Sequence, residues 1–164
     1  MSVKFQVQMN EKYMYDFMKY HNYTSTSGIM NVIAGLLCLA TFVVKISEGD
    51  VQASIWLICA MVFLIVDPYS IKTRAKKQVK NTEMFQKPLE YEISESGVTV
   101  RQGEEEILNS WDTFTKAVST GKCVLLYMGR VRAIILPKEC IGEQYEEMVK
   151  ILHQYMPTKK VRVK

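Results

Sequence analysis

The sequence predicts an α+β membrane protein in which a two-helix transmembrane hairpin carries a small antiparallel β-barrel closed by a carboxy-terminal helix. Two observations predict this class. Residues 29–66 form two apolar runs joined by a short polar loop, and residues 88–157 alternate short β-rich runs with turns before one final helix. A chain of 164 residues has room for only one small domain besides such a hairpin.

The amino-terminal segment, residues 1–28, is predicted to contain one strand and one amphipathic helix. Apolar and polar residues alternate from Val3 to Met9, which is the period of a half-buried strand. The other β-rich runs lie beyond residue 88, so we expect this strand to join their sheet. Asn10 can cap a helix whose apolar stripe runs from Tyr13 to His21. This helix either packs, on the domain or on the first apolar helix, or lies at the membrane surface.

The hairpin, residues 29–69, is predicted from the two apolar runs. Ile29–Val44 contains no Asp, Glu, Lys, Arg or His, and with residues 45–46 it makes a helix of about 27 Å, close to the hydrocarbon thickness of a bilayer. Ala53–Val66 reaches a similar length when its polar end extends it to residue 69. A buried hairpin in a soluble protein is the alternative, but so small a domain cannot cover two helices that are apolar all round.

Basic residues are distributed unevenly around this hairpin. The loop of residues 47–52 carries only Glu48 and Asp50, whereas the connector of residues 70–87 is strongly basic. The positive-inside rule therefore predicts a multi-pass protein of the inner (plasma) membrane with both termini in the cytoplasm. Five side chains of the connector are also candidate contacts for anionic lipid headgroups. They are Lys72, Arg74, Lys76, Lys77 and Lys80.

From residue 88 the chain changes to short β-rich runs separated by turns. Turns every eight to twelve residues predict an antiparallel meander that closes into a barrel or a sandwich. The expected strands are residues 89–93, 98–101, 107–111, 114–119, 123–128 and 131–136. Gly142 opens a helix that ends at Pro157 and covers the open end of the barrel. A basic tail, residues 158–164, follows.

Few residues stand in a pattern that indicates chemistry. The four cysteines and two histidines lack the spacing of zinc, haem or iron–sulfur sites, so we expect no metal and no cofactor. Glu104–Glu106 lie at a turn, where solvation is favoured over acid–base catalysis. No nucleophile motif accompanies the serines, and the tail lacks the interleaved aromatic residues that nucleic-acid binding needs. We therefore expect neither enzyme activity nor a nucleic-acid partner.

Two aromatic residues, Trp111 and Phe114, are candidates for a groove that holds a ligand or a partner. Trp111 begins a strand–turn segment, where an indole ring either fills the interior of the barrel or stacks on a ligand. The sequence leaves both roles open.

Several motifs together resemble those of the YcxB-like proteins of bacteria. They are Tyr20-His21 before the apolar runs, Leu89-x-Tyr91-x-Ile93, Gly97-Val98, Ser110-Trp111-x-x-Phe114-x-Lys116-Ala117-Val118, and Leu136-Pro137-Lys138 before the closing helix. The resemblance implies an inner-membrane hairpin and a cytoplasmic domain, residues 88–157, similar to pleckstrin-homology folds, with seven strands and a capping helix. It implies no established activity and no catalytic residue.

A phosphoinositide site does not follow from this resemblance. Pleckstrin-homology domains that bind such lipids cluster Lys and Arg around the first hairpin, whereas the segment Glu92–Gly97 is acidic and only Arg101 follows it. An acidic loop repels a phosphate group. Kinship of fold alone does not supply the site.

The sequence thus predicts a membrane-anchored cytoplasmic module without catalytic activity that binds a protein partner or a second copy of itself. The alternative is a sensor of anionic lipids that uses the basic connector and the tail. An enzyme with an unrecognised site is the third hypothesis. The lipid bilayer is the partner that the two apolar runs require.

Overall fold

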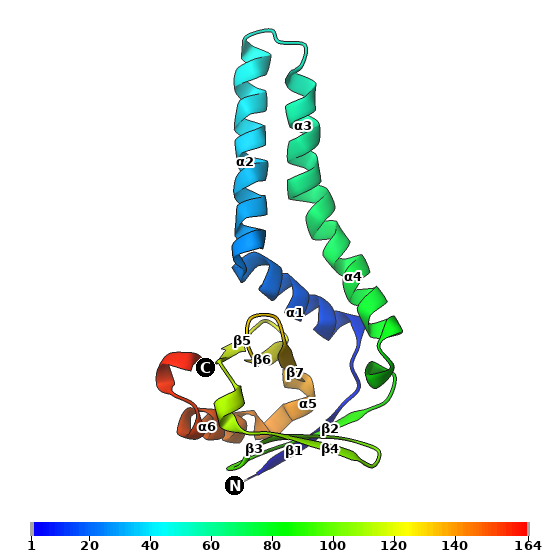
Figure 1. The fold of residues 1–164 in the computed structure, drawn as a ribbon, viewed down its shortest axis with the longest axis vertical. Helices are drawn as coiled ribbons and strands as arrows, with labels where there is room; N and C mark the ends of the chain where they lie inside the picture. Colours follow the sequence, from blue (N-terminus) through cyan, green and yellow to red (C-terminus); the bar gives the residue numbers. More distant parts are fainter. Residues whose placement is uncertain (1, 164) are drawn as a thin grey trace. The chain divides into compact units, whose positions relative to one another are not determined.

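The computed structural model describes residues 2–163, and the chain divides into two compact units. We call residues 2–17 and 76–163 the β domain and residues 18–75 the hairpin unit. Figure 1 shows the elements of both units along the chain. The fold is α+β, as the sequence predicted, with two long apolar helices and two sheets.

Sheet A is antiparallel throughout and has the order β1-β2-β3-β4. Its strands are β1 (Val3–Val7), β2 (Leu89–Ser94), β3 (Gly97–Gln102) and β4 (Glu105–Asn109). Phe5 of β1 lies opposite Tyr91 of β2, and their rings stack with centroids 5.8 Å apart. The predicted pairing of the amino-terminal strand with the later strands is confirmed. The hairpin unit is therefore inserted in the chain between two neighbouring strands.

Sheet B has the order β7-β6-β5-β8. Its strands are β5 (Lys116–Ser119), β6 (Cys123–Tyr127), β7 (Ala133–Pro137) and β8 (Val161–Arg162). The short β8 runs parallel to β5 and lies in the segment predicted only as a basic tail. Val161 and Val163 are buried in the main core, so this end of the chain is packed on the domain.

Short helical elements complete the β domain. They are η2 (Glu83–Phe85), η3 (Trp111–Thr113), α5 (Lys138–Ile141), η4 (Gly142–Gln144), α6 (Tyr145–Tyr155) and η5 (Thr158–Lys160). The main core combines side chains of both sheets with Met148, Ile151 and Leu152 of α6. Closure of the strands into a barrel is not confirmed, because within residues 2–163 β4 and β7 each pair with a strand on one side only.

The first half of α1 (Glu11–Thr24) covers the second face of sheet B. Every residue of β6 is buried, so both faces of this strand are packed. Phe17 lies against Tyr127 at 6.2 Å between ring centroids, and the Asp16 carboxylate accepts hydrogen bonds from the Thr120 hydroxyl and the backbone N–H of Lys122. Of the two roles predicted for this helix, packing on the domain is therefore seen for residues 11–17.

Two local features of this region have clear physical causes. The side chain of Asn10 accepts hydrogen bonds from the backbone N–H groups of Lys12 and Tyr13, which confirms the predicted cap of α1. Burial, followed by the nearby Asp16 charge, raises the pKa of the Cys123 thiol to about 12. Cys123 consequently stays protonated and unreactive at neutral pH.

The hairpin unit contains α2 (Thr26–Ser47), α3 (Ala53–Met61), the π-helical turn η1 (Val62–Val66) and the start of α4 (Asp67–Asn81). Small residues allow α2 to approach α3 and η1 closely. A Cβ atom added at Gly35 would lie 2.7 Å from the side chain of Leu64, and Ala53 and Ala60 are buried. Figure 1 shows the two helices side by side over most of their length.

The π-helical turn has a cause in the sequence. Pro68 lacks a backbone N–H, and its ring would clash with the carbonyl group four residues earlier in a regular α-helix. The backbone N–H of Asp67 instead bonds to the carbonyl oxygen of Val62, five residues back. The helix thus continues through this point from Ala53 to Asn81.

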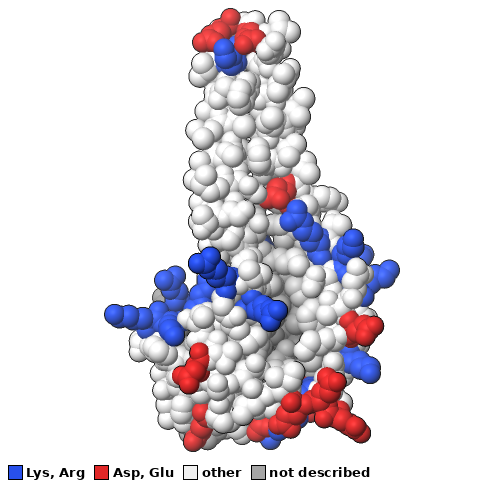
Figure 2. All heavy atoms as spheres, viewed as in Figure 1, with Lys and Arg blue, Asp and Glu red and all other residues white. Residues whose placement is uncertain are grey.

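The outward surface of the hairpin unit is apolar. Leu37 and Ile65 are 63% and 62% exposed, and on the face that Figure 2 shows the hairpin is uncharged over most of its length. The helices Thr26–Ser47 and Ala53–Asn81, of 22 and 29 residues, are long and apolar enough to cross a membrane.

Candidate functional site

The edge strand β4 carries an unusual pair of exposed apolar side chains. Within residues 2–163 this strand pairs with β3 only, and its Ile107 and Leu108 are 54% and 55% exposed. Natural sheets usually protect such an edge with charges or with a covering segment, because its free N–H and C=O groups can pair with another chain. The edge of β4 is therefore a candidate contact surface.

An apolar groove lies beside this edge strand. A pocket of about 250 Å³ lies between residues of β4 and residues of β7, and a second pocket of about 660 Å³ shares Met84, Val100 and Ile107 with it. The smaller pocket is lined by Met9, Met84, Phe85, Leu89, Tyr91, Val100, Ile107, Asn109, Met128, Ala133, Ile134 and Ile135. We call the two pockets together the β4 groove. Its several methionines can adapt their shape to an occupant.

The polar groups of the β4 groove stand mainly at its rim. The larger pocket is lined by Glu83, Gln86, Lys87, Gln102 and Glu105 besides its apolar floor. Deeper in the groove, burial raises the pKa of the Tyr91 phenol to about 12, so this group is uncharged at neutral pH. Among residues 2–163, no group of three or more His, Cys, Asp or Glu could hold a metal ion. The arrangement suits binding by apolar contact rather than acid–base chemistry.

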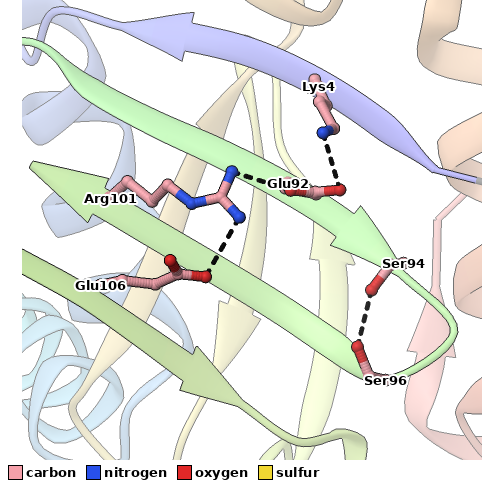
Figure 3. A network of polar contacts seen from close by, with 6 residues as sticks. All are labelled: Lys4, Glu92, Ser94, Ser96, Arg101 and Glu106. Carbon is pink, nitrogen blue, oxygen red and sulfur yellow. Dashed lines mark hydrogen bonds and ion pairs between the residues drawn. The ribbon is translucent and has the colours of Figure 1, made fainter.

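A chain of ion pairs crosses the outer face of sheet A and ends on β4 (Figure 3). Glu92 of β2 contacts Lys4 of β1 at 3.0 Å and Arg101 of β3 at 2.9 Å, and Arg101 also contacts Glu106 of β4 at 3.1 Å. The hydrogen bond from Lys4 is the main cause that lowers the pKa of Glu92, and the bond from Arg101 lowers that of Glu106. The positive charge of Arg101 thus compensates the negative charge of Glu106.

This network predicts a small acid sensitivity of the β domain. Because the pKa values of Glu92 and Glu106 are lowered by folding, their pairs stabilise the fold above the ordinary carboxyl pKa and lose that effect as the pH falls through the lowered values. The double variant Glu92→Gln/Glu106→Gln should therefore show a smaller drop in the thermal unfolding midpoint between about pH 6 and about pH 3. The difference should be small, because solvent screens exposed pairs.

The matched control for this measurement is Glu143→Gln, an exposed carboxylate on η4. It should follow the acid sensitivity of the unsubstituted chain. An equal acid response in the double variant and the unsubstituted chain would contradict the assigned role of the network.

Comparison with known proteins finds a match for the stretch that contains β4 and about half of the residues that line the β4 groove. Residues 93–152 match the family model described as YcxB-like protein. Over these residues the chain is similar to that family, and we call them the YcxB-like segment. The resemblance expected from the sequence is thus confirmed for this YcxB-like segment, while the hairpin unit lies outside the match. No curated protein and no solved structure matches the chain.

The YcxB-like segment contains the two aromatic residues predicted to line a groove, and both rings have protein neighbours. Trp111 stacks on Tyr155 of α6 at 6.0 Å between centroids, and its indole N–H donates to the carbonyl oxygens of Ser94 and Glu95. Phe114 is buried beside Trp111, with ring centroids 5.9 Å apart. Trp111 thus joins α6 to the β2–β3 turn, and neither Trp111 nor Phe114 lines the β4 groove.

The five basic residues predicted as lipid contacts lie on α4, before the YcxB-like segment, and all are exposed. Two have acidic neighbours: Arg74 is 3.7 Å from Asp67, and Lys76 is 3.8 Å from Glu11. No ion pair is described for the other three, Lys72, Lys77 and Lys80. Their role in lipid contact stays a prediction.

Sequence reasoning missed the β4 groove. One signal was present within the YcxB-like segment, since Ile107 and Leu108 are adjacent and point to opposite faces of their strand. A strand with one buried face needs an apolar residue at only one of these positions. The second apolar side chain was therefore a sign of an exposed contact surface.

Proposed function

We propose that the chain is a membrane-anchored cytoplasmic module, without catalytic activity, that recruits a protein partner to the exposed edge of β4. The observation that carries this proposal is the position of that edge beside the apolar β4 groove. A partner strand would pair with the free backbone groups of β4. It would also cover Ile107 and Leu108, which would stabilise the complex by roughly 1 kcal/mol for each side chain.

The hairpin of α2 and α3 is the membrane anchor in this proposal, and the chain is a multi-pass protein of the inner (plasma) membrane with both termini in the cytoplasm. The loop between the helices supports this orientation, because Lys45 lies 3.2 Å from Glu48 and 3.5 Å from Asp50 and leaves no excess of positive charge there. Labelling of the variant Val51→Cys by a membrane-impermeant maleimide tests the orientation. Labelling in intact cells is expected, and labelling only after lysis would contradict it.

We further propose that the β domain is related to the pleckstrin-homology fold. Strands β1 to β7 in two antiparallel sheets, followed by α6, support this relation, because the family resemblance implies seven strands and a capping helix. The hairpin unit is then an insertion between the first two strands. A solved structure with another strand order would contradict this kinship.

Photo-cross-linking tests recruitment at β4. A photoreactive amino acid in place of Leu108 should give one discrete adduct in native membranes, which mass spectrometry identifies as a partner or as a second copy of the chain. The matched control is the same residue in place of Glu90, which also lies on the outer face of sheet A but in the inner strand β2. Equal adducts at both positions, or none at Leu108, would overturn the proposal.

The alternative is a sensor of anionic lipids, which the exposed lysines of α4 favour. Lys72, Lys77 and Lys80 are the charges that would attract an anionic lipid surface. Native mass spectrometry of the full chain with anionic and with zwitterionic phospholipid tests this function. Equal retention of the two lipids would exclude it.

A further inference from the structure

The two faces of β4 would make different demands on a strand added to its edge. Glu105 and Ile107 line the β4 groove, as does Asn109, so these residues face inward. Glu106 bonds to Arg101 on the outer face, and the alternation of the strand places Leu108 on that face too. A partner strand therefore meets one apolar side chain on each face, at adjacent positions.

The groove offers space for a large apolar side chain opposite Ile107. Its smaller pocket holds about 250 Å³, whereas a cavity of about 150 Å³ is large enough for a benzene molecule. Its lining is mainly apolar, with Tyr91 and Asn109 as the residues that carry polar side-chain groups, so it favours an apolar occupant over a polar one. An apolar residue would thus suit the position opposite Ile107, and the exposed Leu108 favours an apolar neighbour on the other face.

The charge of this edge favours a cation next to the apolar pair. Glu106 is compensated by Arg101, and at the rim of the groove Lys87 offsets one of the carboxylates Glu83 and Glu105. No ion pair is described for Glu104 or Glu105. A Lys or Arg opposite Glu105 would lie across the strands from it, where opposite charges attract.

A segment of the chain itself shows that this chemistry suits the groove. Met84 and Phe85 line its apolar part, and Lys87 lines its rim together with Glu105. The order is two apolar residues, one further residue and a cation. Gln102 holds this segment in place through hydrogen bonds to the carbonyl oxygens of Met84 and Lys87.

We infer that the β4 edge binds an extended protein segment that carries two adjacent apolar residues, then any residue, then one or two residues of Lys or Arg. The segment runs antiparallel to β4, as all neighbours in sheet A do, so that its residues lie in turn opposite Leu108, Ile107, Glu106 and Glu105. This inference rests on the proposed function and names the partner's chemistry.

Fluorescence anisotropy of the full chain in detergent micelles tests the inference. The probe is a labelled, end-capped peptide, Ser-Thr-Val-Ile-Thr-Lys-Lys-Ser, and its partner peptide has Glu in place of both Lys residues. The lysine peptide is expected to bind at least about tenfold more tightly than the glutamate peptide. In the variant Glu105→Lys the preference should reverse. Glu146→Lys, on the exposed side of α6, is the matched control and should leave the preference unchanged.

Apolar contact is tested by Ile107→Asn, which should weaken binding of both peptides at least about tenfold without unfolding the chain, because Ile107 is half exposed. Failure of both peptides to bind, or equal binding that Glu105→Lys does not alter, would overturn the inferred chemistry. The inferred chemistry would also be overturned if decanoate occupied the groove without displacing either peptide. A cross-link at Leu108 that forms only between two copies of the chain would overturn it as well. If neither peptide binds, or if both bind equally in a way that Glu105→Lys does not alter, a discrete adduct between Leu108 and another protein would still support the proposed function.

Discussion

The substitution Gly97→Ala is expected to unfold the β domain. Gly97 begins β3 with a φ of +138°, which residues with a side chain rarely adopt. A methyl group at this position would overlap the carbonyl oxygen of Asn109 on β4 and lie 2.9 Å from the Cα atom of Ser110. Both neighbours are backbone atoms, so relief of the overlap requires β4 to move away from β3.

The expected loss in the free energy of unfolding of the Gly97→Ala variant is comparable with the whole stability of a small domain. Backbone strain of this kind costs about 1–3 kcal/mol, and displacement of β4 would break ladder hydrogen bonds as well. Typical domains are stable by only about 5–15 kcal/mol. Thermal unfolding of the purified chain, followed by circular dichroism, should show the loss of the β-domain transition or a much lower midpoint.

Gly103→Ala is the matched control for Gly97→Ala. Gly103 also has a positive φ, +62°, in the turn between β3 and β4, but an added Cβ atom there would meet no heavy atom within 4 Å. The free energy of unfolding of this variant should fall by only about 1–2 kcal/mol, because alanine is strained in the left-handed conformation. Equal losses in the two variants would mean that the contact with Asn109 is unimportant.

The role of Gly97 illustrates how far the sequence predicts this fold. The sequence predicts a turn between the expected strands 89–93 and 98–101, and the structure has β2 and β3 on either side of such a turn. The contact that requires glycine depends on the pairing of Val98 with Asn109 in a third strand. Register between strands is set by the tertiary fold, so a local pattern gives the turn but not its neighbour.

Strand β4 was predicted less well than its neighbours. The sequence predicted a strand at residues 107–111, whereas β4 is Glu105–Asn109 and Trp111 lies in the helical turn η3. The burial pattern of this strand is almost uniformly exposed, so the alternation that marks a half-buried strand is absent. The same exposure that obscured the strand makes its edge a candidate binding surface.

The groove itself could not be predicted from the sequence. Its lining comes from separate segments, among them Met9, Met84 and Ile134, and their proximity follows from the way the two sheets meet. The hairpin, by contrast, depends on contiguous apolar windows, and both predicted runs lie within the long apolar helices of the structure. Properties of a window can be read from a sequence, whereas a site between distant segments requires the fold.

The substitution Leu37→Arg is expected to abolish stable insertion of the hairpin. Leu37 is the twelfth of 22 residues of α2, and its side chain is 63% exposed. In a bilayer, replacement of leucine by arginine near the centre of a helix costs about 3–4 kcal/mol of insertion free energy. The share of the chain that stays in membranes after an alkaline carbonate wash should fall sharply.

Val131→Arg distinguishes a lipid environment from simple exposure. Val131, in the β6–β7 turn of the β domain, is 64% exposed, so both substitutions place arginine at an equally open position. A residue exposed to water tolerates such a change within about 0.5 kcal/mol, because the guanidinium group keeps its hydration. If lipid surrounds α2, only Leu37→Arg removes the chain from membranes. If water surrounds it, the two variants behave alike, and the proposed anchor is wrong.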